Sequence, residues 1–501
     1  MRILKKPLSE ISIYGKLILL IGILIAVPLL VVPFYPQEAR HIPAFLLPLG
    51  ISIVLGLALC LFTQRRERPA ARWQSPLHRG SLPVLLAWSF AFLMGAIPFA
   101  LGRQLSPLLS LFESVGGWTT AGMSVADVSR MPHIFLFYRA FMQYCGGLGF
   151  VIMIAMLVQG KQNMNLYNAE GHPDRLMPSL KRTSRTIFLL YSCFLVAGIL
   201  AYWLCGMRFF DALCHAMSAL STAGFSTRAG GIAQYNSTPI ELITIALMLL
   251  GSTNFAILLL LVKGHFRKIF RVSEVRFMLG LLFLFVSLAT VSLMHNTELG
   301  FGQSLLESLF GIVSTMTTTG YSTMNYALWP SFALGLMMIL MFIGGSIGST
   351  SGGIKLLRAY LLLRIMKENV QRRLSPPRRV TAPSHYRVQG KMPIDQAMIN
   401  DTIGFVACYI AIFIVGALLL TLTANCSLFE AIFEFASAFG TVGFTGGLAT
   451  SSASAGTLFV LMAGMILGRL EIFVVFIGIY AGVQRLGATK IFQKKAHGIG
   501  N

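Results

Sequence analysis

The chain has 501 residues, of which 55% are hydrophobic and only 12% are charged, and its mean hydropathy is +0.73. Soluble globular domains contain about 25% charged residues, so this composition places the chain outside that class and predicts a polytopic membrane protein. Lys and Arg outnumber Asp and Glu by 40 to 18. On a membrane protein such an excess indicates topology and contact with anionic lipid, and we expect no nucleic-acid partner.

Ten apolar segments are long enough to cross a bilayer, and four shorter ones are not. The first long segment is predicted to be a retained helix rather than a signal peptide, because no small-residue cleavage site follows its core. The short segments suit re-entrant helices, which enter and leave the membrane by one face. The predicted spans are 15–34, 44–63, 81–101, 134–159, 186–205, 238–262, 277–294, 332–365, 399–421 and 455–485, and the short segments are 106–118, 209–220, 303–316 and 428–439.

Basic residues between the spans orient the chain. They gather after spans two, four and six, in the stretch 355–391 and in the tail. By the positive-inside rule these regions and both termini are cytoplasmic, so the four short segments all open from the outer face. The predicted fold is all-α and integral to the membrane, with four tandem helix/pore-loop/helix units around one pore and two additional N-terminal transmembrane helices. The corresponding boundaries are 1–79 for the two-helix region and its basic loop, and 80–165, 166–270, 271–390 and 391–501 for the units.

A hydroxyl-rich run that closes on a glycine follows each short segment. Glycine reaches backbone angles that other residues avoid, so such a run can turn its carbonyls toward a common axis. Four runs would form a ring of oxygens able to replace the water shell of a potassium ion. One Thr-x-Gly run is usually a tight turn, but four in register indicate a selectivity filter. The predicted K⁺-binding residues, acting through backbone carbonyls, are Thr120, Ala121, Gly122, Thr222, Ala223, Gly224, Thr318, Thr319, Gly320, Thr441, Val442 and Gly443.

Acidic residues precede three of these glycines at a constant distance. Asp211, Glu307 and Glu430 each lie thirteen residues before a filter glycine, whereas the first unit has Leu109 there and Glu113 one turn later. The acids are expected near the starts of the short helices, where the helix dipole favours negative charge. The alternative is that each acid is merely a capping residue.

Glycines interrupt the eighth predicted span between residues 344 and 353. Each interior glycine costs a helix about 1 kcal/mol relative to alanine, so the helix is expected to break there and to form a plug below the filter. The alternative is a small-residue helix-packing face. The run lacks a Gly-Lys-Ser/Thr ending, which argues against nucleotide binding. The residues assigned to gating are Gly344, Gly345, Ser346, Gly348, Ser349, Thr350, Gly352, Gly353, Lys355 and Arg469.

Arg469 lies in the middle of the apolar stretch 458–480. An arginine at such a depth costs about 2.5 to 3.5 kcal/mol on insertion scales, so it is expected to face a watery path or a partner group. We favour an electrostatic barrier below the filter, where it could also bind carbonyls of the plug. The alternative is a structural ion pair with Glu471.

Four motifs give the chain a family resemblance: 143–149 (QYCGGLG), 317–323 (TTTGYST), 344–355 (GGSIGSTSGGIK) and 468–473 (GRLEIF). Over about residues 80 to 490 the chain resembles the TrkH family of bacterial Trk potassium uptake systems, within the Trk/Ktr/HKT superfamily. The resemblance implies potassium as the transported ion, since sodium-favouring plant relatives have serine in place of the first filter glycine. It also implies an intramembrane gating loop, a homodimer, a cytoplasmic nucleotide-binding ring of the TrkA kind, and a bacterial inner-membrane location.

Two other function classes were weighed against potassium uptake. A membrane enzyme is not predicted, because the sequence contains no HExxH motif and no arrangement of nucleophile, base and metal ligands. No covalently bound cofactor is expected. The alternative is a proton- or sodium-coupled secondary transporter, which would favour inverted repeats rather than four units of one orientation. The sequence leaves open whether transport is passive or ion-coupled.

Overall fold

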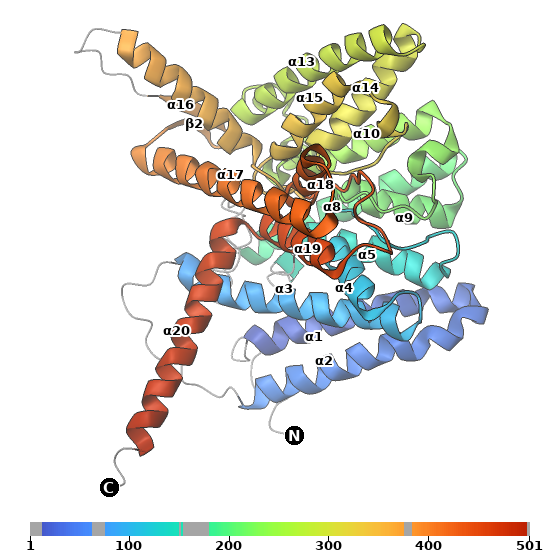
Figure 1. Cartoon of the computed structure of the whole chain (residues 1–501), viewed down its shortest axis with the longest axis vertical. Coiled ribbons are helices and arrows are strands. Elements are labelled where there is room, and N and C mark those ends of the chain that lie inside the picture. The colour runs from blue at the N-terminus through green and yellow to red at the C-terminus, as the bar shows by residue number, and fades with distance from the viewer. Residues whose placement is uncertain (1–12, 63–75, 150–151, 154–179, 375–382, 498–501) are drawn as a thin grey trace.

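The computed structural model describes residues 13–62, 76–149, 152–153, 180–374 and 383–497, and these are mostly helical (Figure 1). The described strands, β1 (Ser384–Arg387) and β2 (Gly390–Pro393), form one antiparallel hairpin. Among the described residues, six helices are long and apolar enough to cross a membrane, or up to eight if each of two bent helix pairs is one span. The prediction of an all-α membrane protein is confirmed at this level.

An N-terminal helical hairpin packs against the first helix of the remaining chain. Its elements are α1 (Ile13–Ala26), η3 (Val27–Phe34), η4 (Pro36–His41) and α2 (Ile42–Phe62), and the helix it contacts is α3 (Pro76–Leu101). Glu38 joins this hairpin to α5 (His133–Leu148) by accepting hydrogen bonds from the backbone N–H groups of His133 at 2.9 Å and Ile134 at 2.8 Å. A carboxylate is stabilised there because the N-terminus of a helix is the positive end of its dipole.

The rest of the chain forms four helix triplets, each with a long helix, a short helix and a third helix. They are α3, α4 (Pro107–Trp118) and α5; α8 (Leu180–Leu204), α9 (Phe209–Leu220) and α10 (Thr238–Ser252) with α11 (Phe255–Val262); α13 (Ser273–Asn296), α14 (Phe301–Met316) and α15 (Ser331–Phe342) with α16 (Leu356–Leu374); α17 (Gln396–Ala424), α18 (Leu428–Gly440) and α19 (Ala455–Arg469) with α20 (Ile472–His497). Between them lie η5 (Gly231–Tyr235), α12 (Phe266–Ile269) and η6 (Tyr326–Leu328).

The triplets contact one another in a cycle. In each triplet the short helix packs against the helices before and after it, and the third helix also contacts the short helix of the next triplet. These cross-triplet contacts are α5 with α9, α10 with α14, α15 with α18, and α19 with α4, so the fourth triplet closes on the first. The four short helices therefore lie inside the assembly, and most of their last turns are buried.

The third helices break where small residues allow close backbone contact. The spans predicted over 238–262 and 455–485 are wrong as single helices, because α10 and α11 are bent by 119° and α19 and α20 by 103°. At the first bend, Asn254 begins α11 by accepting a hydrogen bond from the backbone N–H of Ala256 at 2.7 Å. The interruption predicted in span 332–365 is present, since α15 ends at Phe342. The span predicted over 134–159 ends as helix α5 at Leu148, and most of its remainder lies outside the described residues.

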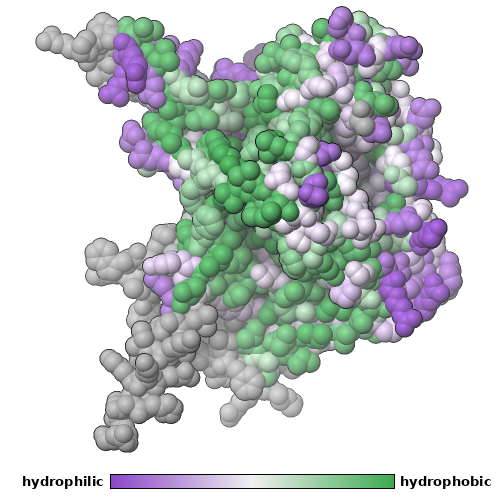
Figure 2. Space-filling model, in the orientation of Figure 1, coloured by the Kyte–Doolittle hydropathy of each residue, from purple (hydrophilic) through white to green (hydrophobic). Residues whose placement is uncertain are grey.

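Apolar side chains cover most of the visible face of the molecule, and hydrophilic ones gather along one edge and on the projecting helix α16 (Figure 2). This distribution suits a protein surrounded by lipid, in which apolar side chains point outward as well as inward. The predicted unit boundaries at 79, 270 and 390 remain predictions, and the one at 165 lies outside the described residues.

Close packing of the third helices gives a first prediction. A Cβ added to Gly146 would lie 2.0 Å from the carbonyl oxygen of Trp118, whereas one added to the helical Gly280 meets nothing within 4 Å. We expect Gly146→Ala to lower the free energy of unfolding by about 1 to 3 kcal/mol, because backbone must move. The control Gly280→Ala should be neutral or stabilising by up to about 1 kcal/mol. Equal thermal stability of the two purified variants in detergent would contradict this account.

Candidate ion-binding site

The four loops predicted to bind the ion share one backbone conformation. In each loop a threonine, and the glycine two residues after it, have φ in the left-handed region. The φ values are 56° for Thr120, 51° for Thr222, 57° for Thr318 and 53° for Thr441, and 69° for Gly122, 81° for Gly224, 80° for Gly320 and 101° for Gly443. This region is strained for a β-branched residue such as threonine. The same strain at four corresponding positions indicates that the loop conformation is held by its surroundings.

The loops also touch one another in a closed cycle. A Cβ added to each glycine would lie against a carbonyl oxygen of the next loop: 2.2 Å from Ala223 for Gly122, 2.1 Å from Thr319 for Gly224, 2.1 Å from Val442 for Gly320, and 2.6 Å from Ala121 for Gly443. Because a side chain cannot fit at such distances, all four positions require glycine. The twelve predicted residues therefore come together, and we call the four loops the carbonyl ring. The ring threonines are buried, whereas the glycines are partly exposed.

A carboxylate on each short helix binds the segment that directly follows the ring loop of the same triplet. Glu113 accepts hydrogen bonds from Ser124 and from the backbone N–H of Val125, and Glu434 accepts from Thr445 at 2.7 Å. The other two triplets use a different position. Asp211 accepts from Thr227 at 2.6 Å and pairs with Arg228, and Glu307 accepts from Thr323 at 2.6 Å. Each acid thus forms hydrogen bonds with residues that lie two to four positions after the ring glycine of its triplet.

The three acids that lie thirteen residues before a ring glycine do not share one structural role. Glu430 lies at the exposed start of α18, where it forms a reciprocal capping box with Ser427. The acid that binds the loop is Glu434, which lies nine residues before its glycine, as Glu113 does in the first triplet. The expectation that Glu307 lies near the start of the third short helix is wrong, because α14 begins at Phe301, six residues before Glu307.

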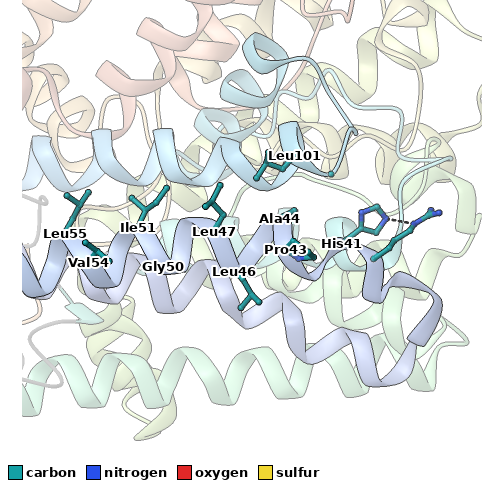
Figure 3. A pocket seen from close by; sticks show the side chains of 12 residues that line it. His41, Pro43, Ala44, Leu46, Leu47, Gly50, Ile51, Val54, Leu55 and Leu101 are labelled. Carbon is teal, nitrogen blue, oxygen red and sulfur yellow. Dashed lines mark hydrogen bonds between the residues drawn. The ribbon is translucent and has the colours of Figure 1, made fainter.

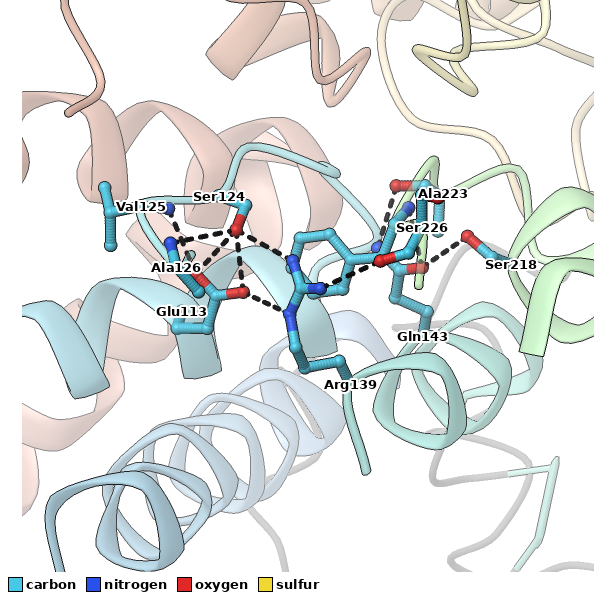
Figure 4. Close-up of polar contacts among 10 residues, drawn as sticks. Glu113, Ser124, Val125, Ala126, Arg139, Gln143, Ser218, Ala223 and Ser226 are labelled. Atoms are coloured by element: carbon cyan, nitrogen blue, oxygen red, sulfur yellow. Dashed lines mark hydrogen bonds and ion pairs between the residues drawn. The ribbon is translucent and has the colours of Figure 1, made fainter. Parts of the chain in front are cut away.

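A buried ion pair joins the first two loops of the ring (Figure 4). Arg139 on α5 donates to Glu113 at 2.6 Å and to Ser124 at 2.7 Å, and also to the carbonyl oxygen of Ser226 at 3.1 Å. Its side chain is only 2% exposed. Sequence reasoning did not assign Arg139, although it is a charge within a predicted span, the same feature that identified Arg469.

Gln143 lies one helical turn beyond Arg139 and is completely buried (Figure 4). Its amide N–H donates to the ring carbonyl of Ala223 at 2.8 Å, and its amide oxygen accepts from Ser218 at 2.6 Å and from the backbone N–H of Phe225 at 3.2 Å. The residue belongs to a motif that suggested the family resemblance, but the sequence alone gave it no role.

The segment between α15 and α16 is held at its base by backbone hydrogen bonds. Gly344 N–H donates to Ile354 O at 2.8 Å, and Ser346 N–H donates to Ser252 O at 2.9 Å. Gly345 lies against Ser252 as well, and Ser349 closes a turn by donating to Ser346 O at 2.6 Å. Two glycines of the segment adopt positive φ, 72° at Gly348 and 65° at Gly353. These residues form an irregular loop rather than a helix-packing face.

The top of this loop lies against the threonine side of the ring. The hydroxyl of Thr350 is 2.9 Å from that of Thr222, and Gly352 N–H donates to the hydroxyl of Thr318 at 3.2 Å. A Cβ on Gly352 would lie 2.1 Å from the hydroxyl oxygen of Thr441. The loop therefore contacts three of the four ring threonines.

Two cations bind carbonyls of the same loop. Arg469 donates to Thr350 O and also to Gly146 O at 2.6 Å and Gly147 O at 3.1 Å, so it links the loop to the end of α5. Lys355 donates to Ser351 O. Arg469 is the last residue of α19, at the 103° bend, and not in the middle of a continuous span.

Glu471, the acid considered as a partner for Arg469, forms an ion pair with Arg358 of α16 at 2.9 Å. The helix that follows the loop is thereby joined to the bend between α19 and α20. The expectation that Arg469 could bind carbonyls of the loop agrees with these contacts.

A groove of about 1000 Å³ lies away from the ring, between α2 and the end of α3 (Figure 3). Its walls are mostly apolar, with Leu47, Ile51 and Leu101 among them, and Arg40 and His41 lie at one end. The residues predicted for ion binding or gating do not line it.

Sequence comparison assigns this helical membrane protein to a class of transporters. The profile of the TrkH family, described as cation transport proteins, matches residues 74–480, and the chain belongs to this family. The chain is 30% identical over 485 residues to the Trk system potassium uptake protein TrkH of Escherichia coli K12, covering 93% of this chain and 96% of that protein. It is also 30% identical over 489 residues to TrkH of Vibrio parahaemolyticus, covering 94% and 97%.

The fold agrees with these relationships. The crystal structure of the potassium transporter TrkH from Vibrio parahaemolyticus matches with a TM-score of 0.80 and 28% sequence identity, over 94% of this chain and 97% of that one. The family resemblance inferred from the four motifs is thus confirmed. The relatives are named as potassium uptake proteins, which is consistent with the prediction of a transporter rather than an enzyme.

The Glu113–Arg139 pair gives a second prediction. Arg139→Met should lower the free energy of unfolding by about 3 to 5 kcal/mol, because it leaves a buried carboxylate without its partner. The double variant Glu113→Gln/Arg139→Met should recover much of that loss, since no uncompensated charge remains. Denaturant unfolding of each purified variant measures both effects.

The matched control is Arg130→Met, which removes an arginine with a 90% exposed side chain from a pair with Asp127 at 3.7 Å. Exposed pairs contribute little, so this variant should unfold like the unmodified protein. If Arg139→Met were as mild as Arg130→Met, the buried pair would not hold the two loops together.

Proposed function

We propose that this protein conducts potassium across the inner membrane through the carbonyl ring. The supporting observation is the closed cycle of contacts in which each ring glycine faces a carbonyl oxygen of the next loop. Oxygens gathered in this way can replace the hydration shell of a dehydrated cation. The ligands would be the backbone carbonyls of the twelve ring residues, arranged as four pore loops in four tandem units.

Potassium is the proposed ion for two reasons. All four loops have glycine at the third ring position, as the resemblance to potassium-selective members of the superfamily requires. The relatives from Escherichia coli and Vibrio parahaemolyticus are named potassium uptake proteins. Coupling to protons or sodium is the alternative, and flux measured with and without gradients of these ions distinguishes the two.

The loop of residues 343–355 is the proposed gate. It lies against the threonine side of the ring through Thr350 and Gly352, and it contains the small residues that permit movement without a large change in packing. Arg469 would hold the loop in its closed position through its hydrogen bonds to the carbonyl oxygens of Thr350 and Gly147. Its positive charge would also oppose the passage of cations leaving the ring. Lys355 adds a second positive charge at the same loop.

The proposed orientation follows from the basic segments. The positive-inside rule assigns both termini, the stretch 355–391 and the gate side of the ring to the cytoplasm. A nucleotide-binding ring of the TrkA kind would then bind the cytoplasmic face and set the position of the gate. Two observations support such a partner: the relatives are named as members of a Trk system, and α16, which follows the gate, projects from the body (Figure 1). The pore subunit itself is proposed to be a homodimer in contact with anionic lipid.

The third prediction tests the ring. Gly320→Asp should abolish preference for potassium over sodium, because a Cβ would lie 2.1 Å from the carbonyl oxygen of Val442 and the side chain adds a fixed charge. The control Gly335→Ala lies in α15, where an added Cβ meets nothing within 4 Å, and should transport normally. Potassium and sodium uptake into liposomes containing each variant measures the ratio, and an unchanged ratio in Gly320→Asp would remove the third loop from the filter.

The fourth prediction tests the gate. A chain shortened within 344–353 should carry potassium without its cytoplasmic partner, while its preference for potassium over sodium persists because the ring is intact. Arg469→Ala should also raise the flux of potassium measured without the partner, since it removes both the hydrogen bonds that hold the loop and the positive charge below the ring. Liposome uptake with and without the partner, alongside thermal stability, provides the measurement. A stable shortened variant whose flux still requires the partner would show that the gate lies elsewhere.

A further inference from the structure

One set of corresponding positions in the four triplets does not hold the same side chain throughout. Three glycines of the third helices occupy equivalent positions. An added Cβ on each would lie close to the carbonyl oxygen of the residue two before a ring threonine, at 2.0 Å for Gly146, 2.1 Å for Gly251 and 1.9 Å for Gly468. Three residues before these glycines stand Gln143, Met248 and Met465. In the remaining triplet the match rests on sequence position, because an added Cβ on Gly344 would lie 1.8 Å from the carbonyl oxygen of Gly352, and Met341 stands three residues before Gly344. All four side chains are buried.

The exception, Gln143, is the one member of this set that can donate a hydrogen bond, because a methionine thioether has no N–H. Its N–H binds the carbonyl of Ala223 at 2.8 Å, and this is the carbonyl that faces Gly122 in the closed cycle. The other face of the amide is also occupied, since Ser218 and the backbone N–H of Phe225 both donate to its oxygen. The amide therefore has a fixed orientation and binds the second loop on both sides of Gly224.

We infer that Gln143 is a positioning residue that sets ion selectivity through the carbonyl of Ala223. The amide N–H restrains this carbonyl from turning inward around an ion smaller than potassium. At the corresponding positions of the other three triplets, a methionine side chain has no N–H with which to donate such a hydrogen bond. This set of side chains is thus asymmetric, because a glutamine binds one ring carbonyl and methionines stand at the other three positions. This inference rests on the proposed function of the ring as a potassium filter.

The restraint is itself well supported by the surrounding structure. Arg139, one turn earlier on α5, pairs with Glu113 and donates to Ser226 O, which lies just beyond the second loop. The guanidinium also stacks on the ring of Phe225 at 4.0 Å. Helix α5 therefore contacts this part of the chain at Ala223, Phe225 and Ser226, and Gln143 makes the contact that reaches a ring carbonyl (Figure 4).

Two substitutions separate the role of the N–H from packing. Gln143→Met gives the first triplet the residue found in the other three, and Gln143→Glu keeps an oxygen to accept from Ser218 and Phe225 but loses the N–H. Both should lower the ratio of potassium to sodium uptake into liposomes by about three- to tenfold, the range expected for the loss of one hydrogen bond. The control Met248→Leu, at the equivalent position of α10, should keep the ratio of the unmodified protein.

The outcomes distinguish this inference from the proposed function. If the unmodified protein prefers potassium and Gly320→Asp does not, the proposed filter is supported. In that case an unchanged ratio of potassium to sodium uptake in folded Gln143→Met and Gln143→Glu overturns only the role of Gln143. An equal fall in Met248→Leu would also overturn it, because packing would explain the effect. If neither Gln143 variant folds, the residue serves stability and not selection. A preference for potassium missing from the unmodified protein would instead refute the proposed filter.

Discussion

The close approach of four glycines to four carbonyl oxygens is the constraint on which the rest of the structure depends. At 2.1 to 2.6 Å from an added Cβ, each of these carbonyls leaves no room for a side chain, and the threonines before the glycines adopt strained left-handed angles. Such a conformation persists only if its surroundings hold it. The buried carboxylates, the short helices and the closed cycle of triplets all contribute to that support.

The support is built from charged and polar groups in a region where they are costly. Glu113, Arg139 and Gln143 are completely or almost completely buried, and each has hydrogen-bond partners in the loops that it holds. A buried ion pair contributes little net stability, but breaking it is expensive because the remaining charge stays buried. The arrangement therefore favours one geometry of the loops over others. In the proposed function, that geometry is what distinguishes one cation from another.

The loop of residues 343–355, which is the proposed gate, differs from the ring in how it is held. Its hydrogen bonds to the ring threonines involve a hydroxyl at Thr222 and a backbone N–H at Thr318, and most of its residues are glycine, serine or threonine. A segment of this kind has little apolar area to lose when it moves, so its position can respond to a modest free-energy change. Arg469 and the Arg358–Glu471 pair connect the loop to α5, α16 and the bend before α20. Movement of the ends of these helices is therefore transmitted to the ring through a short chain of contacts.

The sequence by itself determined the membrane class, the family and the bounds of the short helices to within two residues, because hydrophobic length and glycine motifs are local properties. It also identified the twelve ring residues and the interruption at 344–353 as candidates. Only the tertiary structure separated Glu430, a capping residue, from Glu434, which binds the loop, since spacing along a helix does not specify its partner. The roles of Arg139 and Gln143 and the sharp bends after α10 and α19 were likewise decided in three dimensions, because each depends on a contact with a distant part of the chain.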